Sequence, residues 1–451
     1  MNFNKKLAVA VSGAVMLMAG QFALADSTSD IVDALVGKGV LTEEEGKLIT
    51  KGHESAKSKA AKVVDKNGAL SLSSADGKSS IAVSGRIQLD ARGYDNDIAS
   101  SGNTQGFDIR RAYLGVSGTM GKYYDYKIVG NFADDDKTNT SGGQFKKSNQ
   151  LDEAFFGINF WKEASFRFGQ QKMPFSLEEQ TSSRFIDFQE RSLLNKMVPG
   201  KEMGVQVHGV FTNGLFYGAA LSSGEGKSNI EASTGEGVDF IGRIGINFAE
   251  AMGNKDDVYH LAVAGSSANG LQSNTQQLAF NSESRGFDNK GSSLRYERDR
   301  VGVEGSVALG PLKLQSEWIR NDFKNDTASA DMDGYYVSAN YMITGEKYAS
   351  SYKAGKYDRM TPKKNFNPDG DGMGAWEVGA RFTSADGKDL YRLNSGAMST
   401  YYAADSTTIG LKWIPTAYTR ILLNYVGTEW ETYAGAKVDE RALTLRTQMD
   451  F

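Results

Sequence analysis

The chain ends on the stretch Leu443-Thr444-Leu445-Arg446-Thr447-Gln448-Met449-Asp450-Phe451. Apolar and polar residues alternate through it with a period of two, which is typical of a β-strand and not of a helix. One face carries leucine, methionine and phenylalanine side chains, and the other carries whole charges such as Arg446 and Asp450. Such a strand needs apolar surroundings on one side and polar surroundings on the other.

The same alternation begins at Ser80 and returns in segment after segment. In one of them, Tyr126 and Ile128 alternate with Lys127 and Asn131. We expect sixteen strands, at residues 80–90, 107–117, 123–132, 151–159, 164–170, 203–211, 214–222, 237–247, 258–265, 297–308, 311–321, 333–343, 374–383, 406–414, 417–430 and 439–451. A soluble β-sandwich shows the same alternation, so the pattern alone leaves two all-β architectures open.

The first 25 residues have the composition of a secretory signal peptide. Lys5 and Lys6 precede an apolar run from Leu7 to Gly20, and Ala23-Leu24-Ala25 offers the small residues that a signal peptidase requires. We therefore expect an exported protein with a signal peptide at residues 1–25. Beyond residue 25, no run of about 18 apolar residues indicates a transmembrane helix.

The composition excludes several classes of function. The 451 residues include 51 Lys and Arg, 55 Asp and Glu, three His and no Cys. Without Cys there is no disulfide, thiolate metal site or cysteine nucleophile, and three scattered His argue against a zinc or iron site. The mixed charge disfavours a nucleic-acid partner. Since no Ser–His nucleophile setting is recognisable either, we expect no cofactor and no enzyme activity.

Export, an even number of strands and an aromatic final residue favour a barrel over a sandwich. In lipid, every backbone polar group must be paired, and a closed ladder of strands achieves this. We expect a 16-stranded antiparallel transmembrane β-barrel at residues 79–451, in contact with lipid and lipopolysaccharide of the bacterial outer membrane. A barrel of this size leaves a water-filled lumen. A plugged receptor barrel would need a plug of the order of a hundred residues, whereas about 55 residues lie between the expected signal peptide and the first strand.

Residues 26–78 show a helical period instead. Ile31 and Leu35 lie at helical spacing, and Thr42 followed by Glu45 forms a capping-box pattern. We expect a short periplasmic helical hairpin or coiled-coil segment. It could serve as a solvated spacer, or it could contact the cell wall or other copies of the chain.

Two connections between strands are exceptional. If the last strand ends in the periplasm, short turns fall on that side and most long connections lie outside. The outer connection 171–202 is rich in apolar residues, so we expect it to fold into the lumen as a constriction, with a surface lid as the alternative. The connection 344–373 is long yet falls on the periplasmic side.

Several motifs of the chain are similar to those of one porin family. They are Phe107-Asp108-Ile109-Arg110-Arg111-Ala112-Tyr113-Leu114-Gly115, Tyr124-Asp125-Tyr126-Lys127, Thr181-Ser182-Ser183, Glu190-Arg191-Ser192, Tyr341-Met342-Ile343-Thr344-Gly345-Glu346 and Pro362-Lys363-Lys364. Together they resemble the phosphate-selective porin (porin O and P) family over almost the whole chain beyond the signal peptide. The resemblance implies a homotrimer of sixteen-stranded barrels, in which a ladder of arginines leads small anions to a constriction and lysines cluster at the periplasmic mouth.

By these motifs, the resemblance implies anion-binding or pore-lining roles for nine residues. They are Arg86, Arg110, Arg111, Tyr113, Lys127, Asp152, Arg191, Lys363 and Lys364.

Strand alternation gives an independent expectation for some of these side chains. It places Arg86, Arg111, Tyr113 and Lys127 on the lumen face. Arg110 reaches that face only if a β-bulge intervenes, and Asp152 falls on the outward face. An inward arginine could instead form an ion pair within the wall, such as Arg111 with Glu153.

Glu179 departs from the pattern of the strictly phosphate-selective members. It stands two residues before Thr181, where such a member would be expected to carry a lysine. Loss of two lysines with the signal peptide also changes the formal net charge from −4 to −6. We therefore expect an anion channel in which general anion passage ranks beside phosphate or pyrophosphate passage. A nonspecific or cation-preferring porin for small hydrophilic solutes is the alternative.

Overall fold

The computed structural model describes most of the chain beyond its first residues. The described ranges are 27–66, 69–97, 105–133, 150–161, 163–224, 226–227, 238–271, 282–285, 296–393 and 401–451. The expected signal peptide lies outside the described residues. Among the described helices, none is long and apolar enough to cross a membrane.

The N-terminal part is a helical hairpin. Helix α2 (Ser27–Gly37) contacts helix α3 (Glu43–Lys59), and the short strands β1 (Lys62–Lys66) and β2 (Ala69–Ser73) follow. The expected capping box is present, because the Thr42 N–H donates to Glu45 Oε2 at 2.9 Å and the Glu45 N–H donates to Thr42 Oγ1 at 3.2 Å. This reciprocal pair fixes where α3 begins.

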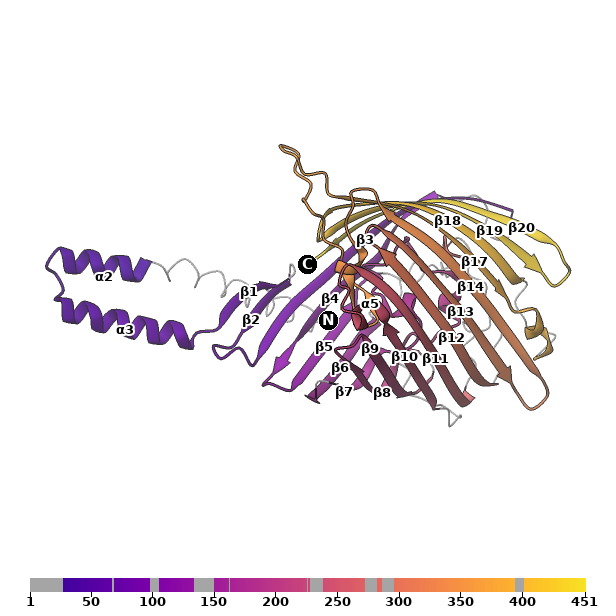
Figure 1. The fold of residues 1–451 in the computed structure, drawn as a ribbon, viewed down its shortest axis with the longest axis horizontal. Helices are drawn as coiled ribbons and strands as arrows, with labels where there is room; N and C mark the ends of the chain where they lie inside the picture. The colour runs from indigo at the N-terminus through magenta and orange to yellow at the C-terminus, as the bar shows by residue number, and fades with distance from the viewer. Residues whose placement is uncertain are drawn as a thin grey trace, which may run out of the picture. The chain divides into compact units, whose positions relative to one another are not determined.

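The rest of the chain forms a closed antiparallel barrel of sixteen strands. Each strand pairs with the next along the chain, and the last pairs with the first. Figure 1 shows the strands side by side from β3 to β20. Their bounds are β3 Ser80–Asn96, β4 Gln105–Met120, β5 Tyr124–Asn131, β6 Gln150–Trp161, β7 Ala164–Lys172, β8 Lys201–Val210, β9 Leu215–Ser222, β10 Asp239–Asn247, β11 Asp257–Leu271, β12 Tyr296–Leu309, β13 Leu312–Lys324, β14 Ser329–Met342, β17 Ala375–Asp386, β18 Tyr401–Thr416, β19 Thr419–Thr432 and β20 Lys437–Asp450.

The barrel closes where β20 meets β3. Gly85 and Phe451 exchange backbone hydrogen bonds of 2.8 and 3.1 Å, and the Phe451 ring lies over Gly85. A Cβ atom added to Gly85 would lie 2.2 Å from this ring, so a larger residue here would displace the ring from its place over β3. The aromatic final residue therefore covers the seam of the barrel.

Alternation along each strand separates a lipid face from a lumen face. In β12, Val301, Val303 and Val307 are exposed on the outside, whereas Arg298 and Arg300 are buried inside. This inside-out distribution is the expected one for a strand with hydrocarbon on one side and a polar lumen on the other.

All sixteen expected strands are present, but several extend further than expected. Strand β3 continues to Asn96, β11 to Leu271, and β18 begins at Tyr401. These extensions lie on the side of the long connections. There the outward side chains no longer face hydrocarbon, so the apolar alternation by which we recognised strands disappears before the ladder ends.

The long connection between β7 and β8 folds into the lumen, as expected. It contains α4 (Leu177–Gln180) and a 3₁₀ turn, η1 (Leu193–Lys196). Its apolar side chains Met173, Phe175 and Met197 are fully buried and pack with wall residues of the barrel. We call residues 173–200 the constriction loop.

The connection between β14 and β17 also folds inward. It contains η3 (Tyr348–Ser351) and a two-stranded hairpin of β15 (Tyr352–Lys353) and β16 (Lys356–Tyr357). Tyr348 and Tyr357 are buried in one cluster with Leu177 of the constriction loop. The two infolded segments therefore meet within the barrel. The remaining short helices, α5 (Phe248–Ala251) and η4 (Lys388–Arg392), lie between barrel strands.

Candidate functional site in the barrel lumen

Four arginines surround one carboxylate of the constriction loop. Glu190 accepts from Arg110 Nε at 2.9 Å, from Arg446 Nη2 at 2.6 Å and from Arg92 Nη2 at 3.3 Å, and Arg111 Nη2 lies 3.8 Å away. Strands β3, β4 and β20 supply these arginines. We call these four arginines and Glu190, together with Asp90, the arginine cluster.

Asp90 is the second carboxylate of the arginine cluster. It accepts from Arg446 Nε at 2.6 Å and Nη2 at 2.8 Å, and it pairs with Arg92. Burial alone would raise the pKa of Glu190, but Arg110, Arg446 and Arg111 hold it well below its usual range. Glu190 is therefore ionised, and the cluster carries an excess of two positive charges.

A shift in strand alternation brings Arg110 and Arg111 to the same side. Phe107 and Ile109 are exposed outside before the pair, and Leu114 is exposed outside after it. Because the outward positions change from odd to even numbers, both arginines reach Glu190. This is the irregularity that Arg110 requires to face the lumen.

Asp152 lies inside, so the outward placement from alternation was wrong. The pairing of β5 with β6 skips one residue, because Val129 opposes Glu153 while Gly130 opposes Leu151. The bulge turns Asp152 inward, where it binds Lys201 and Lys227 and accepts from the Tyr113 hydroxyl at 3.3 Å.

Arg86 and Lys127 face the lumen on neighbouring parts of the wall. Arg86 donates to Ser183 Oγ of the constriction loop at 2.9 Å and lies over the Tyr113 ring at 4.3 Å. Lys127 forms an ion pair with Glu153. Glu153 is the residue that the alternative interpretation had assigned to Arg111 as its partner in the wall. Arg111 instead donates to Gln88 Oε1 at 2.9 Å.

Arg191 holds the constriction loop together. Its guanidinium donates to the backbone carbonyls of Glu178 and Thr181 at 3.0 and 2.8 Å. It also pairs with Glu179 at 3.2 Å, and Lys172 lies 3.5 Å from the same carboxylate. Glu179 is therefore neutralised by cations of its own neighbourhood.

Lys363 and Lys364 lie in the infolded connection between β14 and β17. The Lys363 N–H donates to Glu346 Oε1 at 3.1 Å, and its ammonium lies 3.5 Å from the Thr344 carbonyl. Lys364 is exposed. These contacts keep Lys363 within its own connection, so the structure does not bring this pair to the arginine cluster.

A third infolded segment was not predicted from the sequence. Residues 282–285, between β11 and β12, insert Glu283 into the lumen. Its carboxylate accepts from Arg381 Nη2 at 2.6 Å, from the hydroxyls of Thr383 and Thr408 at 2.7 Å each, and from the Leu193 N–H at 3.3 Å. Arg381 also binds Glu178 at 2.9 Å, so one guanidinium fastens two connections.

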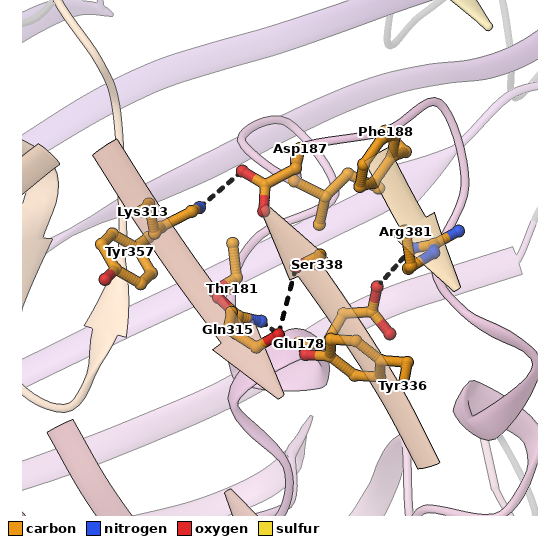
Figure 2. A pocket seen from close by; sticks show the side chains of 11 residues that line it. Glu178, Thr181, Asp187, Phe188, Lys313, Gln315, Tyr336, Ser338, Tyr357 and Arg381 are labelled. Carbon is orange, nitrogen blue, oxygen red and sulfur yellow. Dashed lines mark hydrogen bonds and ion pairs between the residues drawn. The ribbon is translucent and has the colours of Figure 1, made fainter. Parts of the chain in front are cut away.

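A small cavity lies between the constriction loop and strands β13, β14 and β17. Figure 2 shows Lys313 and Arg381 at opposite sides of this cavity, facing Asp187 and Glu178 of the loop. The aromatic residues Tyr336 and Tyr357 also line it. Its wall thus offers paired charges and hydroxyl groups to a small polar solute.

A closed sixteen-stranded barrel with a lipid-facing apolar belt and a constricted, charged lumen defines an outer-membrane porin. It is a channel and not an enzyme. The chain belongs to the family described as phosphate-selective porin O and P, whose model matches residues 81–451.

The similar proteins agree with this assignment. Porin O of Pseudomonas aeruginosa is 26% identical over 362 residues, which cover 72% of this chain and 77% of that protein. Two solved structures share the fold. They are the anion-selective porin from Comamonas acidovorans (TM-score 0.54, 14% identity, 83% of this chain and 100% of that one) and the outer membrane channel DcaP of Acinetobacter baumannii (TM-score 0.53, 13% identity, 83% of this chain and 98% of that one).

Proposed function

We propose that the porin preferentially passes small inorganic anions, with phosphate or pyrophosphate among them. The observation that carries this proposal is the arginine cluster, in which four guanidinium groups face two carboxylates. Rings of like charge at a constriction set the selectivity of a pore, whatever the net charge of the whole chain. An excess of positive charge at this point attracts anions and repels cations.

The chemistry of the cluster suits oxyanions in particular. A guanidinium group stays charged and presents several donors in a planar fork, so it can replace part of the water shell of a phosphate. Glu179 does not oppose this, because Arg191 and Lys172 neutralise it. The name of the family and of its relative Porin O supports phosphate as a solute.

Replacing Arg111 with alanine should lower the ratio of anion to cation permeability about threefold or more. The variant removes one charge from the cluster and leaves Gln88 without its donor. Reversal potentials in planar bilayers under a KCl gradient measure the ratio. Arg320→Ala, at an exposed ion pair with Asp322, is the matched control. A cation-selective wild-type channel would refute the proposed function, and an unchanged ratio in Arg111→Ala would make Arg111 a wall residue only.

We infer that the barrel assembles as a homotrimer. The inference rests on membership of the family, because the resemblance of the sequence motifs to that family implies a trimer. The unheated protein should migrate in mild detergent as one species of three times the monomer mass. Migration as a stable monomer would contradict it.

A further inference from the structure

Two cavities of the lumen meet at a single ion pair. The first is the small cavity beside Arg381, and the second lies nearer the connection between β14 and β17. Both are lined by Asp187, Lys313 and Tyr357. Figure 2 shows the contact between Lys313 and Asp187 at one side of the first cavity. The pair therefore stands at the boundary between the two spaces.

Three separate parts of the chain build this boundary. Lys313 projects from β13, and its ammonium lies 2.6 Å from Asp187 Oδ1 of the constriction loop. The same ammonium lies over the rings of Tyr348 and Tyr357, at 4.8 and 4.2 Å from their centroids. Aromatic faces attract a cation, so the two rings can hold the ammonium even when the carboxylate is absent.

Cations continue on both sides of the boundary. In the first cavity, Arg381 pairs with Glu178. In the second cavity, Lys412 pairs with Glu377 at 2.8 Å. The wall of strands β13, β17 and β18 thus carries cations that face both cavities. Each of these cations forms an ion pair with a carboxylate.

Arg420 adds a donor without a partner to the second cavity. Its side chain projects from β19, is almost fully buried and lies over the Phe185 ring at 4.6 Å. Its Nη1 donates to the Arg184 carbonyl, while its Nη2 has no hydrogen-bond partner among the described residues. A buried donor of this kind is free to bind an acceptor that is not part of the wall.

We propose that Lys313 is an anion-transfer site between the two cavities, which Asp187 closes at rest. This inference rests on the proposed anion passage and specifies one step of it. A small inorganic anion in the first cavity replaces the Asp187 carboxylate at the Lys313 ammonium and then moves on toward Lys412 and Arg420. The lysine suits the exchange because its ammonium is a point charge with three rotatable donors on a flexible stem. No covalent bond forms or breaks.

The absence of cysteine from the chain allows a direct test. Lys313→Cys introduces a single thiol, which a negatively charged, sulfonate-bearing thiosulfonate reagent can modify during single-channel recording. We expect modification to lower the conductance at least twofold, because it places a negative charge where the Lys313 ammonium stood. Lys347→Cys, at an exposed ion pair with Asp256, is the matched control and should react without a change in conductance.

Two further variants separate transfer from a purely structural contact. Asp187→Asn should at least double the chloride conductance, because it removes the resting occupant, while Lys313→Met should lower the ratio of anion to cation permeability about threefold. If the Lys313–Asp187 ion pair is purely structural, both variants should change the conductance in the same direction, and both should leave the ratio of anion to cation permeability unchanged. That result, or a modified Lys313→Cys channel with unchanged current, would overturn the proposal. A wild-type channel without anion preference would overturn the proposed function itself. Heat-dependent migration in detergent confirms that each variant has folded.

Discussion

Replacing Glu190 with glutamine should raise the ratio of anion to cation permeability about fivefold or more. It should also lower, about tenfold, the phosphate concentration at which half of the chloride current is blocked. Glutamine keeps the shape of the side chain but removes the negative charge that four arginines now share. A unit charge about 6 Å away is worth about 3 kcal/mol at an effective dielectric constant of about 20. Even half of this value, after screening, corresponds to a factor of about ten.

The same substitution should make the barrel less stable. Removal of one partner from a buried ion cluster typically costs about 3 to 5 kcal/mol, because the remaining charges lose their counter-ion. Unfolding in urea, followed by heat-dependent migration in detergent, measures this loss. Glu429→Gln, at an exposed pair with Lys437, is the matched control for both measurements. Lower or unchanged anion preference in Glu190→Gln would show that permeating ions do not meet the cluster.

Replacing Arg381 with methionine should about double the single-channel conductance and lower the free energy of unfolding by about 3 to 5 kcal/mol. Among the described residues, Arg381 is the one cation that forms ion pairs both with Glu178 of the constriction loop and with Glu283 of the segment 282–285. Without it, two buried carboxylates face each other without a shared cation. We expect both connections to move away from the wall and to widen the passage.

The effect of pH distinguishes this electrostatic account from lost packing. Burial raises the pKa of Glu178, and Arg381 opposes that rise. Loss of the arginine should raise the pKa further, so the stability gained on protonation is present at acidic pH and lost as pH increases. The variant should therefore recover part of its unfolding free energy below about pH 5, relative to neutral pH. Equal destabilisation at both pH values, or the same loss in Arg320→Met, would contradict this reasoning.

The strands of the barrel were predictable because lipid imposes a simple rule on them. Wherever hydrocarbon lies on one side, outward residues must be apolar, so the period of two is visible in β12 and in the stretch from Leu443 to Phe451. The rule ends where the membrane ends. Residues 91–96 of β3 and 401–405 of β18 were not predicted as strand for this reason, although their backbone pairing with the neighbouring strands continues.

The site was only partly predictable, because two single-residue irregularities reverse the alternation. The shift at Arg110 and Arg111 and the bulge at Asp152 move side chains across the wall, and neither has a distinct sequence signal. The partners of these residues, Glu190 and Lys201, come from distant parts of the chain. Strand alternation alone could have assigned Arg446 to the lumen, but nothing in its own strand indicated that it would meet Glu190.

The contact of Phe451 with Gly85 also bears on the order of assembly. It joins parts of the chain that are separated by about 360 residues, as the Gln88–Gln448 hydrogen bond beside it illustrates. Contacts so distant in sequence are slow to form, because the entropy of the intervening chain is lost before they contribute. Until they form, β3 and β20 are open edges that can pair with any other extended chain. Pairing of β3 with β20 is thus the step at which an aggregation-prone sheet becomes a barrel without open edges.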